Sequence, residues 1–307
     1  MAGASGNIKN PAWYSGGLGV ALAPGAGNVF YVNGGSDGPV VDTGSGLTPD
    51  DPKQLLQSAI DLCTNENNDY VIVLNYGGNA RAVEAWPVEV NKTMCHIIGV
   101  GDLAAKWPLV SSDDDNPALL ITADRVEIAN MNLGGGATTG AIHVGDAGGT
   151  WGTNIHDCFF GVEGTAQDGI RVPAATAAPY LTVTNCRFDR GITRDGIRFE
   201  GNATRCRIGL PGRGNMFTNL DSGSGGIGIN LTVGVTEPGI FDNIFAIDAD
   251  TAGAAITFAA AVVDGVIDGN RAGFGDTAGN NMFLDNAAAD ANNWLTNYSG
   301  IVMTYPG

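Results

Sequence analysis

The chain has 307 residues, 44% of them hydrophobic, so it is long enough for one large domain or two ordinary ones. Charged residues make up only 15%, and the 47 glycines are about twice the usual share, a composition that favours short strands and tight turns over helices. The formal net charge of −17 argues against nucleic-acid and membrane partners, because phosphate binding needs clustered Lys and Arg.

Residues 1–27 form a Gly- and Ala-rich segment with one charged residue, Lys9, and no periodicity. We expect an extended arm, with Trp13 and Tyr14 as contacts that hold it in an assembly. The segment lacks the basic and apolar regions of a signal peptide. The five cysteines show no paired spacing, so we expect synthesis in a reducing cytosol and free, buried thiols.

Residues 28–92 are predicted to form an N-terminal cap. Strands at 28–33 and 70–75 flank a helix predicted over 52–63, with Asp51 as the N-cap, Pro52 at the first helical position and Gln54 at the capping-box position. One apolar stripe of this helix is expected to cover the first coil: Leu55, Leu56, Ala59, Ile60 and Cys63.

Residues 93–275 repeat a short pattern, read as AIHV, GIRV, GIRF, GINL and AITF. Its isoleucines stand 28, 27, 32 and 27 residues apart, at Ile142, Ile170, Ile197, Ile229 and Ile256. A second series runs in step and places a turn-forming residue once per repeat, at Asn130, Asp157, Asn185, Gly214, Asp242 and Asp268.

Two strands and a bend every 28 or so residues are too short for a βαβ unit with a crossover helix. We therefore predict an all-β fold, a right-handed parallel β-helix in which the isoleucines stack inside the column. The last segment, 276–307, contains Trp294 and Tyr298 and is expected to close the last coil or to contact a neighbour in an assembly.

The segments GNVFYVNGGSDG, GLTPDDPKQLLQSAIDLC and NDYVIVLNYGG resemble the opening of pectate-lyase-like right-handed β-helix proteins. The stretch AIDLCTNENNDYVIVL is most similar to β-helix proteins of tailed-phage virions. The resemblance covers residues 28–100 by motif and 100–275 by architecture. It implies the fold, but this fold carries lyases, hydrolases, epimerases, adhesins and inert structural spikes, so it implies no single activity.

Two Asp-Gly-Ile-Arg copies place Asp168 and Asp195 on neighbouring coils. A glycosidase needs two carboxylates roughly 5–10 Å apart, so these two are the candidate catalytic pair. An aspartate before glycine at the start of a strand is also a common turn cap, and we favour that structural interpretation. The Gly-His-Gly and Arg-Ile-Lys segments of the polygalacturonase-like hydrolases are absent from the sequence.

The polar residue of each repeat is expected to point outward and to form a ladder: His143, Arg171, Arg198, Asn230 and Thr257. His143, Arg171 and Arg198 are the candidate ligand-binding residues, for an acidic glycan or a partner's carboxylate. The acidic run 113–115 is interpreted as a solvated turn, because consecutive strand residues face opposite ways; no cofactor is expected, with Ca²⁺ as the alternative.

Together these features favour a non-enzymatic virion structural protein of a tailed phage, displayed on the capsid as a decoration or as a short spike. We expect a homotrimer located in the virion, with other virion proteins as partners and neither nucleic acid nor membrane. One alternative is a polysaccharide-degrading tailspike, either a lyase or a glycoside hydrolase. Another is an adhesin that binds a host surface glycan without turnover.

Overall fold

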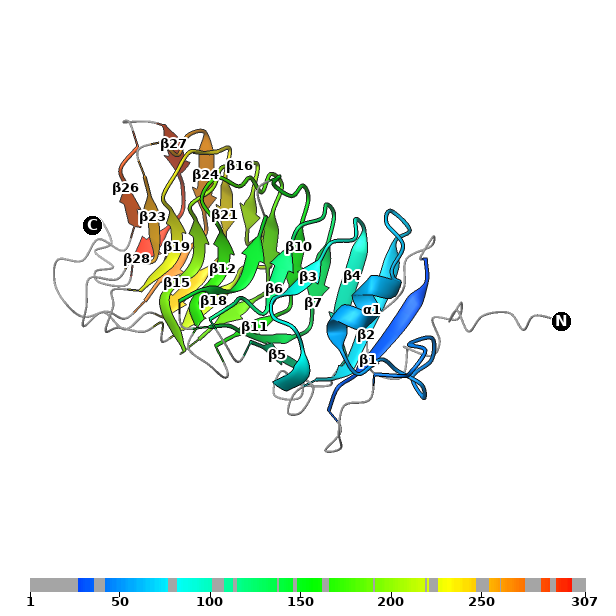
Figure 1. The fold of residues 1–307 in the computed structure, drawn as a ribbon. Coiled ribbons are helices and arrows are strands. Elements are labelled where there is room, and N and C mark those ends of the chain that lie inside the picture. The colour runs from blue at the N-terminus through cyan, green and yellow to red at the C-terminus, as the bar shows by residue number, and fades with distance from the viewer. Residues whose placement is uncertain are drawn as a thin grey trace, which may run out of the picture.

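The computed structural model shows a column of stacked coils built from parallel strands (Figure 1). The predicted all-β parallel β-helix is confirmed. The structure describes residues 27–35, 42–76, 82–100, 108–112, 115–136, 138–145, 148–161, 166–189, 191–218, 220, 226–246, 254–259, 261–273, 283–287 and 291–299. No helix in these ranges is long and apolar enough to cross a membrane.

Three parallel sheets run along the column. The first has ten strands, in the order β1 (Val29–Asn33), β2 (Asp69–Asn75), β4 (Cys95–Gly99), β7 (Glu127–Ala129), β10 (Asn154–His156), β13 (Thr182–Thr184), β17 (Arg207–Ile208), β21 (Gly239–Phe241), β24 (Gly265–Asp268) and β27 (Asn292–Trp294). The second has eight, in the order β5 (Leu109–Ser111), β8 (Asn132–Gly134), β11 (Phe159–Phe160), β14 (Arg187–Phe188), β18 (Met216–Thr218), β22 (Ile244–Ala246), β25 (Arg271–Ala272) and β28 (Tyr298–Ser299).

The third sheet also has eight strands, in the order β3 (Val88–Val90), β6 (Leu119–Ile121), β9 (Gly140–Val144), β12 (Ala166–Val172), β15 (Ile192–Phe199), β19 (Ile227–Leu231), β23 (Ile256–Phe258) and β26 (Phe283–Asp285). A separate pair joins β16 (Ala203–Thr204) to β20 (Val235–Thr236). The repeat positions fall in this third sheet, so its outer face is where the predicted polar ladder lies.

The predicted isoleucine ladder is confirmed in the third sheet. Its five members pair in register and are fully buried: Ile142, Ile170, Ile197, Ile229 and Ile256. Leu119 precedes Ile142 and Phe283 follows Ile256 in the same register. Burying one such side chain stabilises the fold by about 1.5–3 kcal/mol, so the ladder is a main source of cohesion between coils.

A phenylalanine ladder, which the sequence did not predict, stacks beside the isoleucines. Its ring centroids are 4.6, 4.7 and 4.7 Å apart along Phe160, Phe188, Phe217 and Phe245. A Cβ atom added at Gly196 would lie 2.6 Å from the ring of Phe217, and one at Gly169 would meet Phe188 at the same distance. The repeated Asp-Gly-Ile-Arg motif therefore needs its glycine because a ring occupies the space of a side chain.

An internal asparagine ladder is the second unpredicted feature. Each side-chain Nδ2 donates to the next Oδ1 at 2.9 Å along Asn215, Asn243, Asn270 and Asn297. Each of the last three Oδ1 atoms also accepts the backbone N–H of the preceding asparagine, at 2.9–3.1 Å. These amides are satisfied by one another, as buried polar groups must be.

The predicted bend residues are confirmed in part. Asn130, Asp157, Asn185 and Asp242 have φ angles of 52–56°. Gly214 does not adopt a positive φ angle, and the last bend lies at Gly269 (φ 69°) instead of Asp268, which pairs with Phe241 as the final residue of β24. Both residue types of the Asp-Gly pair tolerate a bend, so the sequence alone gave no reason to choose the second.

The cap helix α1 (Leu56–Leu62) is shorter than predicted, and the predicted N-cap is wrong. The carboxylate of Asp51 accepts the backbone N–H of Ser45, whereas Glu84 accepts that of Leu56 at 2.8 Å. Pro52 and Gln54 therefore precede the helix. The N–H group at the start of the helix therefore donates to a carboxylate 28 residues further along the chain. A local capping motif in the sequence does not reveal such a distant partner.

The helix covers the first coils beside β1 and β2 (Figure 1). Its predicted stripe is buried at Leu56, Ala59, Ile60 and Cys63, while Leu55 is half-buried. β1 and β2 continue the first sheet, so the cap shares its hydrogen bonds with the coils. The free, buried state predicted for the cysteines is confirmed for all five.

Candidate functional site

The predicted polar ladder lies on the outer face of the third sheet. Its members pair in register across β9, β12, β15, β19 and β23: His143, Arg171, Arg198, Asn230 and Thr257. Strand alternation places them opposite the buried ladder positions, because side chains point to opposite faces in turn. What this row can do depends on the neighbours of its charged members.

Glu200, the residue directly after β15, bridges the two ladder arginines. Its Oε2 accepts from Nε and Nη2 of Arg171 at 2.8 and 2.6 Å, and its Oε1 accepts from Nε of Arg198 at 2.7 Å. Burial acts to raise the pKa of Glu200, but the hydrogen bonds from Arg198 and Arg171 outweigh it and lower that pKa. Both guanidinium groups are therefore engaged within the protein.

The two aspartates of the repeated motif do come together, in register on β12 and β15. Asp168 is fully buried and accepts two hydrogen bonds from Arg194, at 2.9 and 2.5 Å. Asp195 accepts from Arg198 Nη1 at 2.6 Å and from Asn230 Nδ2 at 3.0 Å. Burial raises the pKa of Asp195, and these hydrogen bonds oppose that shift.

The resulting ion-pair network is electrically neutral. The carboxylates of Asp168, Asp195 and Glu200 are matched by the guanidinium groups of Arg171, Arg194 and Arg198. Burial and, secondarily, the charge of Arg171 lower the pKa of His143 to about 4, so its ring is neutral at pH 7. A glycosidase carboxylate must contact its substrate, and this network leaves neither aspartate open to one.

Glu200 and Arg194 were not among the predicted site residues. Glu200 had a readable signal, because it stands two residues after Arg198, directly beyond the end of β15, and extended backbone there keeps it on the same face. Arg194 had none, because the pairing of β12 with β15 shifts register between Ala166 and Asp168. A single extra residue in β15 brings Arg194 over Asp168.

A second polar chain crosses the outer face of the first sheet. His96 Nδ1 lies 2.5 Å from Glu127 Oε2, Glu127 Oε1 lies 2.8 Å from His156 Nε2, and His156 Nδ1 lies 2.6 Å from Asp157 Oδ2. The hydrogen bonds of His156 and then His96 lower the pKa of Glu127 to about 2. Burial acts to lower the pKa of His156, but its bonds to Asp157 and Glu127 prevail and raise it to about 9.

The acidic run 113–115 has only Asp115 among the described residues, where it is exposed. Asp113 and Asp114 lie outside the described ranges, so the Ca²⁺ alternative for this run stays without a structural test. Within the described part of the chain, no three His, Cys, Asp or Glu side chains form a group that could hold a metal ion.

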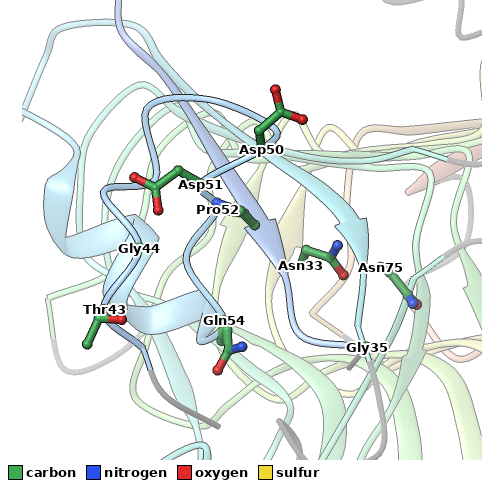
Figure 2. Close-up of a pocket in the computed structure, with 9 residues that line it drawn as sticks. All are labelled: Asn33, Gly35, Thr43, Gly44, Asp50, Asp51, Pro52, Gln54 and Asn75. Carbon is green, nitrogen blue, oxygen red and sulfur yellow. The ribbon is translucent and has the colours of Figure 1, made fainter. Parts of the chain in front are cut away.

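A polar cavity of about 460 Å³ lies beside the cap. Asn33 and Asn75 face it from the ends of β1 and β2, and the segment before α1 contributes Thr43, Gln54, Asp50 and Asp51 (Figure 2). The carboxylates of Asp50 and Asp51 point in different directions. Amides and hydroxyls here can bind hydroxyl-bearing molecules, but the described lining supplies no nucleophile with an adjacent base.

The predicted assembly residues fall in different places. Trp294 packs against Phe258 and Phe283, with ring centroids 5.2 and 5.8 Å away, and its Nε1 donates to Asp285 at 2.7 Å. Tyr298 is 52% exposed on β28. Trp13 and Tyr14 lie outside the described residues, so a role for any of these aromatics in assembly stays a prediction.

Comparison with known proteins gives no family. No protein-family model matches the chain, and no curated protein is significantly similar to it. Among solved structures, a GH136 lacto-N-biosidase from Eubacterium ramulus is 12% identical, with a TM-score of 0.37, covering 90% of this chain and 68% of that one. A likeness at this level carries no argument about function.

Proposed function

We propose that the protein is a non-enzymatic structural β-helix of a tailed-phage virion, displayed on the capsid or as a short spike. The observation that supports a structural role is the ion-pair network, in which every charged group has a partner within the protein. Two of the residues expected to bind or react are ion-paired within the protein, Arg171 with Glu200 and Asp168 with Arg194, across two neighbouring coils. The phage part of the proposal rests on the resemblance of residues 28–100.

The interior supports the same role. Isoleucine, phenylalanine and asparagine ladders run from coil to coil, so neighbouring coils are fixed by apolar burial and by hydrogen bonds at once. Such a column gains stability from every repeat interface and behaves as a rod. A rod with an acidic surface suits display on a particle, where it must stay folded and must not bind other molecules unspecifically.

The homotrimer and the contacts with other virion proteins belong to the same proposal. They rest on the aromatic residues near both ends of the sequence, with Tyr298 exposed on the last coil. Exposed aromatic side chains are common anchors of protein interfaces.

The tailspike enzyme is the weaker alternative. It needs Asp168 or Asp195 to act on a glycosidic bond, and the side chain of Asp168 is 0% exposed beneath Arg194. The polar cavity beside the cap does not replace the pair, because its two carboxylates point in different directions. The adhesin alternative needs a surface other than the arginine ladder.

The proposal is tested on purified native particles. Antibody labelling against this chain, combined with electron cryomicroscopy, is expected to find it in the particle as a column roughly 40–45 Å long, the height of the ten stacked strands of the first sheet at about 4.8 Å per step. Absence of the chain from intact particles would contradict the virion role. Release of reducing ends or of unsaturated sugars from a polysaccharide panel would contradict the non-enzymatic role.

A further inference from the structure

A row of exposed side chains follows one corner of the column, away from the ion-pair network. It consists of Arg125, Trp151, Tyr180, Arg205 and Glu237, which we call the aromatic corner. These residues come from five successive coils, two or three positions before β7, β10, β13, β17 and β21. Four of them share a left-handed backbone with φ of 54–59°, and Gly152 takes that conformation beside Trp151. The repeated geometry aligns the five side chains.

Direct contacts join the members of the aromatic corner. The guanidinium carbon of Arg125 lies 5.2 Å from the ring centroid of Trp151. Trp151 meets Tyr180 edge to face at 5.3 Å. Arg205 donates to the Tyr180 hydroxyl at 3.2 Å and to Glu237 at 2.7 Å. Cation–π and edge-to-face contacts fix the orientation of the two rings, so they stand in place before any ligand arrives.

The exposure of these rings has no structural purpose that the fold shows. Trp151 and Tyr180 are 43% and 38% exposed, whereas the rings of the phenylalanine ladder are fully buried. The equivalent positions of other coils carry Asn68, Met94 and Asp264, which shows that the bend does not need an aromatic ring. Clustered exposed aromatic side chains mark binding surfaces.

We propose that the aromatic corner binds a linear glycan that runs parallel to the axis of the column. Fixed Trp and Tyr rings offer large amphipathic faces at low entropic cost, and the C–H faces of pyranose rings stack on such surfaces. The row covers four coil steps of about 4.8 Å, roughly 19 Å, which accommodates a short stretch of a polysaccharide.

Arg125 defines the charge of the ligand. Arg125 Nη1 donates to the sulfur of Met94 at 4.0 Å, but no described carboxylate forms an ion pair with this guanidinium group, so its other N–H donors can bind a carboxylate-bearing sugar. Arg205 is neutralised by Glu237, as the Nε–Oε2 distance of 2.7 Å shows. The net charge of −17 repels a dense polyanion at long range, which favours a glycan with isolated acidic sugars.

This inference does not rest on the virion role, and the two can fail separately. A glycan site on the corner fits a displayed rod that attaches to a host, and it supplies the adhesin alternative with the surface that the arginine ladder lacks. It involves none of the ion-paired residues of the third sheet.

The test begins with the full chain on a printed array of bacterial and animal oligosaccharides, some neutral and some containing uronic or sialic acid. The glycan that binds best is then titrated by calorimetry. Trp151→Ala and Tyr180→Ala are each expected to weaken binding at least tenfold without a change in Tm. Arg125→Ala should weaken binding of the acidic glycan and spare a neutral analogue. Ile244→Ala, which removes an exposed apolar side chain from the second sheet, should leave binding unchanged.

A second measurement protects the test against misfolded variants. Intrinsic tryptophan fluorescence of the wild type should shift on addition of the glycan, and the conservative Trp151→Phe should remove that shift. No binding to any glycan on the array would overturn the proposal, as would binding that Trp151→Ala and Tyr180→Ala leave intact. If these variants instead change the sedimenting mass, the corner is a contact between protein subunits and the glycan proposal is wrong.

Discussion

Asp168 shows how its neighbours decide what a carboxylate does. It stands in a motif that repeats on the next coil, as one of two catalytic aspartates would, yet Arg194 covers it and Gly169 ahead of Ile170 faces a phenylalanine ring. Each letter of the repeated motif has a structural reason: a buried ion pair, space for a ring, an apolar rung and an outward ion pair. The repetition comes from stacking and requires no repeated activity.

The first prediction concerns Arg194→Ala. This change leaves the buried charge of Asp168 without its bidentate partner, and breaking such a pair costs roughly 3–5 kcal/mol. Chemical denaturation followed by circular dichroism should show a corresponding loss in the free energy of unfolding. Arg205→Ala, which removes an ion pair at a solvated corner, is the matched control and should leave the midpoint unchanged. Equal midpoints for both variants would contradict the structural role of Arg194.

The second prediction is a pH dependence centred on His156. Its pKa rises from the ordinary 6.5 to about 9, so its contribution to stability is complete below pH 6.5 and disappears as the pH rises through about 9. Glu127 has its pKa lowered from 4.5 to about 2, so its contribution is complete above pH 4.5. Between pH 4.5 and 6.5 both are present.

His156→Gln tests this window against the wild type. The difference in Tm between the two proteins should be largest between pH 4.5 and 6.5 and should vanish above pH 9. The buried His143 titrates in the opposite sense, because its lowered pKa makes protonation destabilising, but it is present in both proteins and cancels in the difference. A Tm difference that stays constant across this range would show that His156 is held by packing and not by charge.

At the scale of the elements, periodic apolar positions were readable from the sequence and specific polar partners were not. The isoleucines recur at nearly constant spacing, and coil stacking follows from that spacing alone. The predicted helix N-cap was wrong because the carboxylate that accepts from the helix end belongs to Glu84, 28 residues further along the chain. The last bend moved by one residue, to Gly269, because two neighbouring residues both permit a turn.

In the candidate site, too, the periodic positions could be predicted from the sequence and the specific polar partners could not. The ladder from His143 to Thr257 followed from the repeat, since residues at equal positions of a coil must stack. The partners Arg194 and Glu200 decide whether that ladder is open, and the first depends on a register shift that leaves no trace in the repeat. The aromatic corner was not predicted, because Trp151 and Tyr180 lie between the strands whose repeat the sequence shows.

The third prediction belongs to the asparagine ladder. Asn243→Ala removes two hydrogen bonds accepted by Oδ1 and two donated by Nδ2, including one to the carbonyl of Ile208. Each buried partner left unsatisfied costs about 1–3 kcal/mol, so the free energy of unfolding should fall by several kcal/mol. Asn297→Ala removes hydrogen bonds of the same kind at the half-buried end of the ladder. Water can replace them there, so this change should cost much less. Similar losses for the two variants would mean that the ladder does not act through burial.

At the scale of the whole molecule, the fold closes its own first coil. The outer edge of β1 is already bonded, because Tyr31 donates to the Gly46 carbonyl and Lys53 donates to that of Tyr31, both at 2.8 Å. α1 covers the interior with Leu56 and Ile60 fully buried. An exposed strand edge would be a template for aggregation, and these contacts among described residues cover it.

The last prediction therefore concerns deletion of residues 1–24, a segment that lacks the period of the coils. The truncated chain should keep the circular dichroism and the Tm of the full chain, because every described hydrogen bond at β1 remains. It should lose the assembly that the arm is expected to hold, seen as a smaller mass in sedimentation. The full chain at the same concentration is the control, since association depends on concentration. If truncation instead abolishes the cooperative unfolding transition, the segment belongs to the first coil, and the division into arm and cap at residue 27 is wrong.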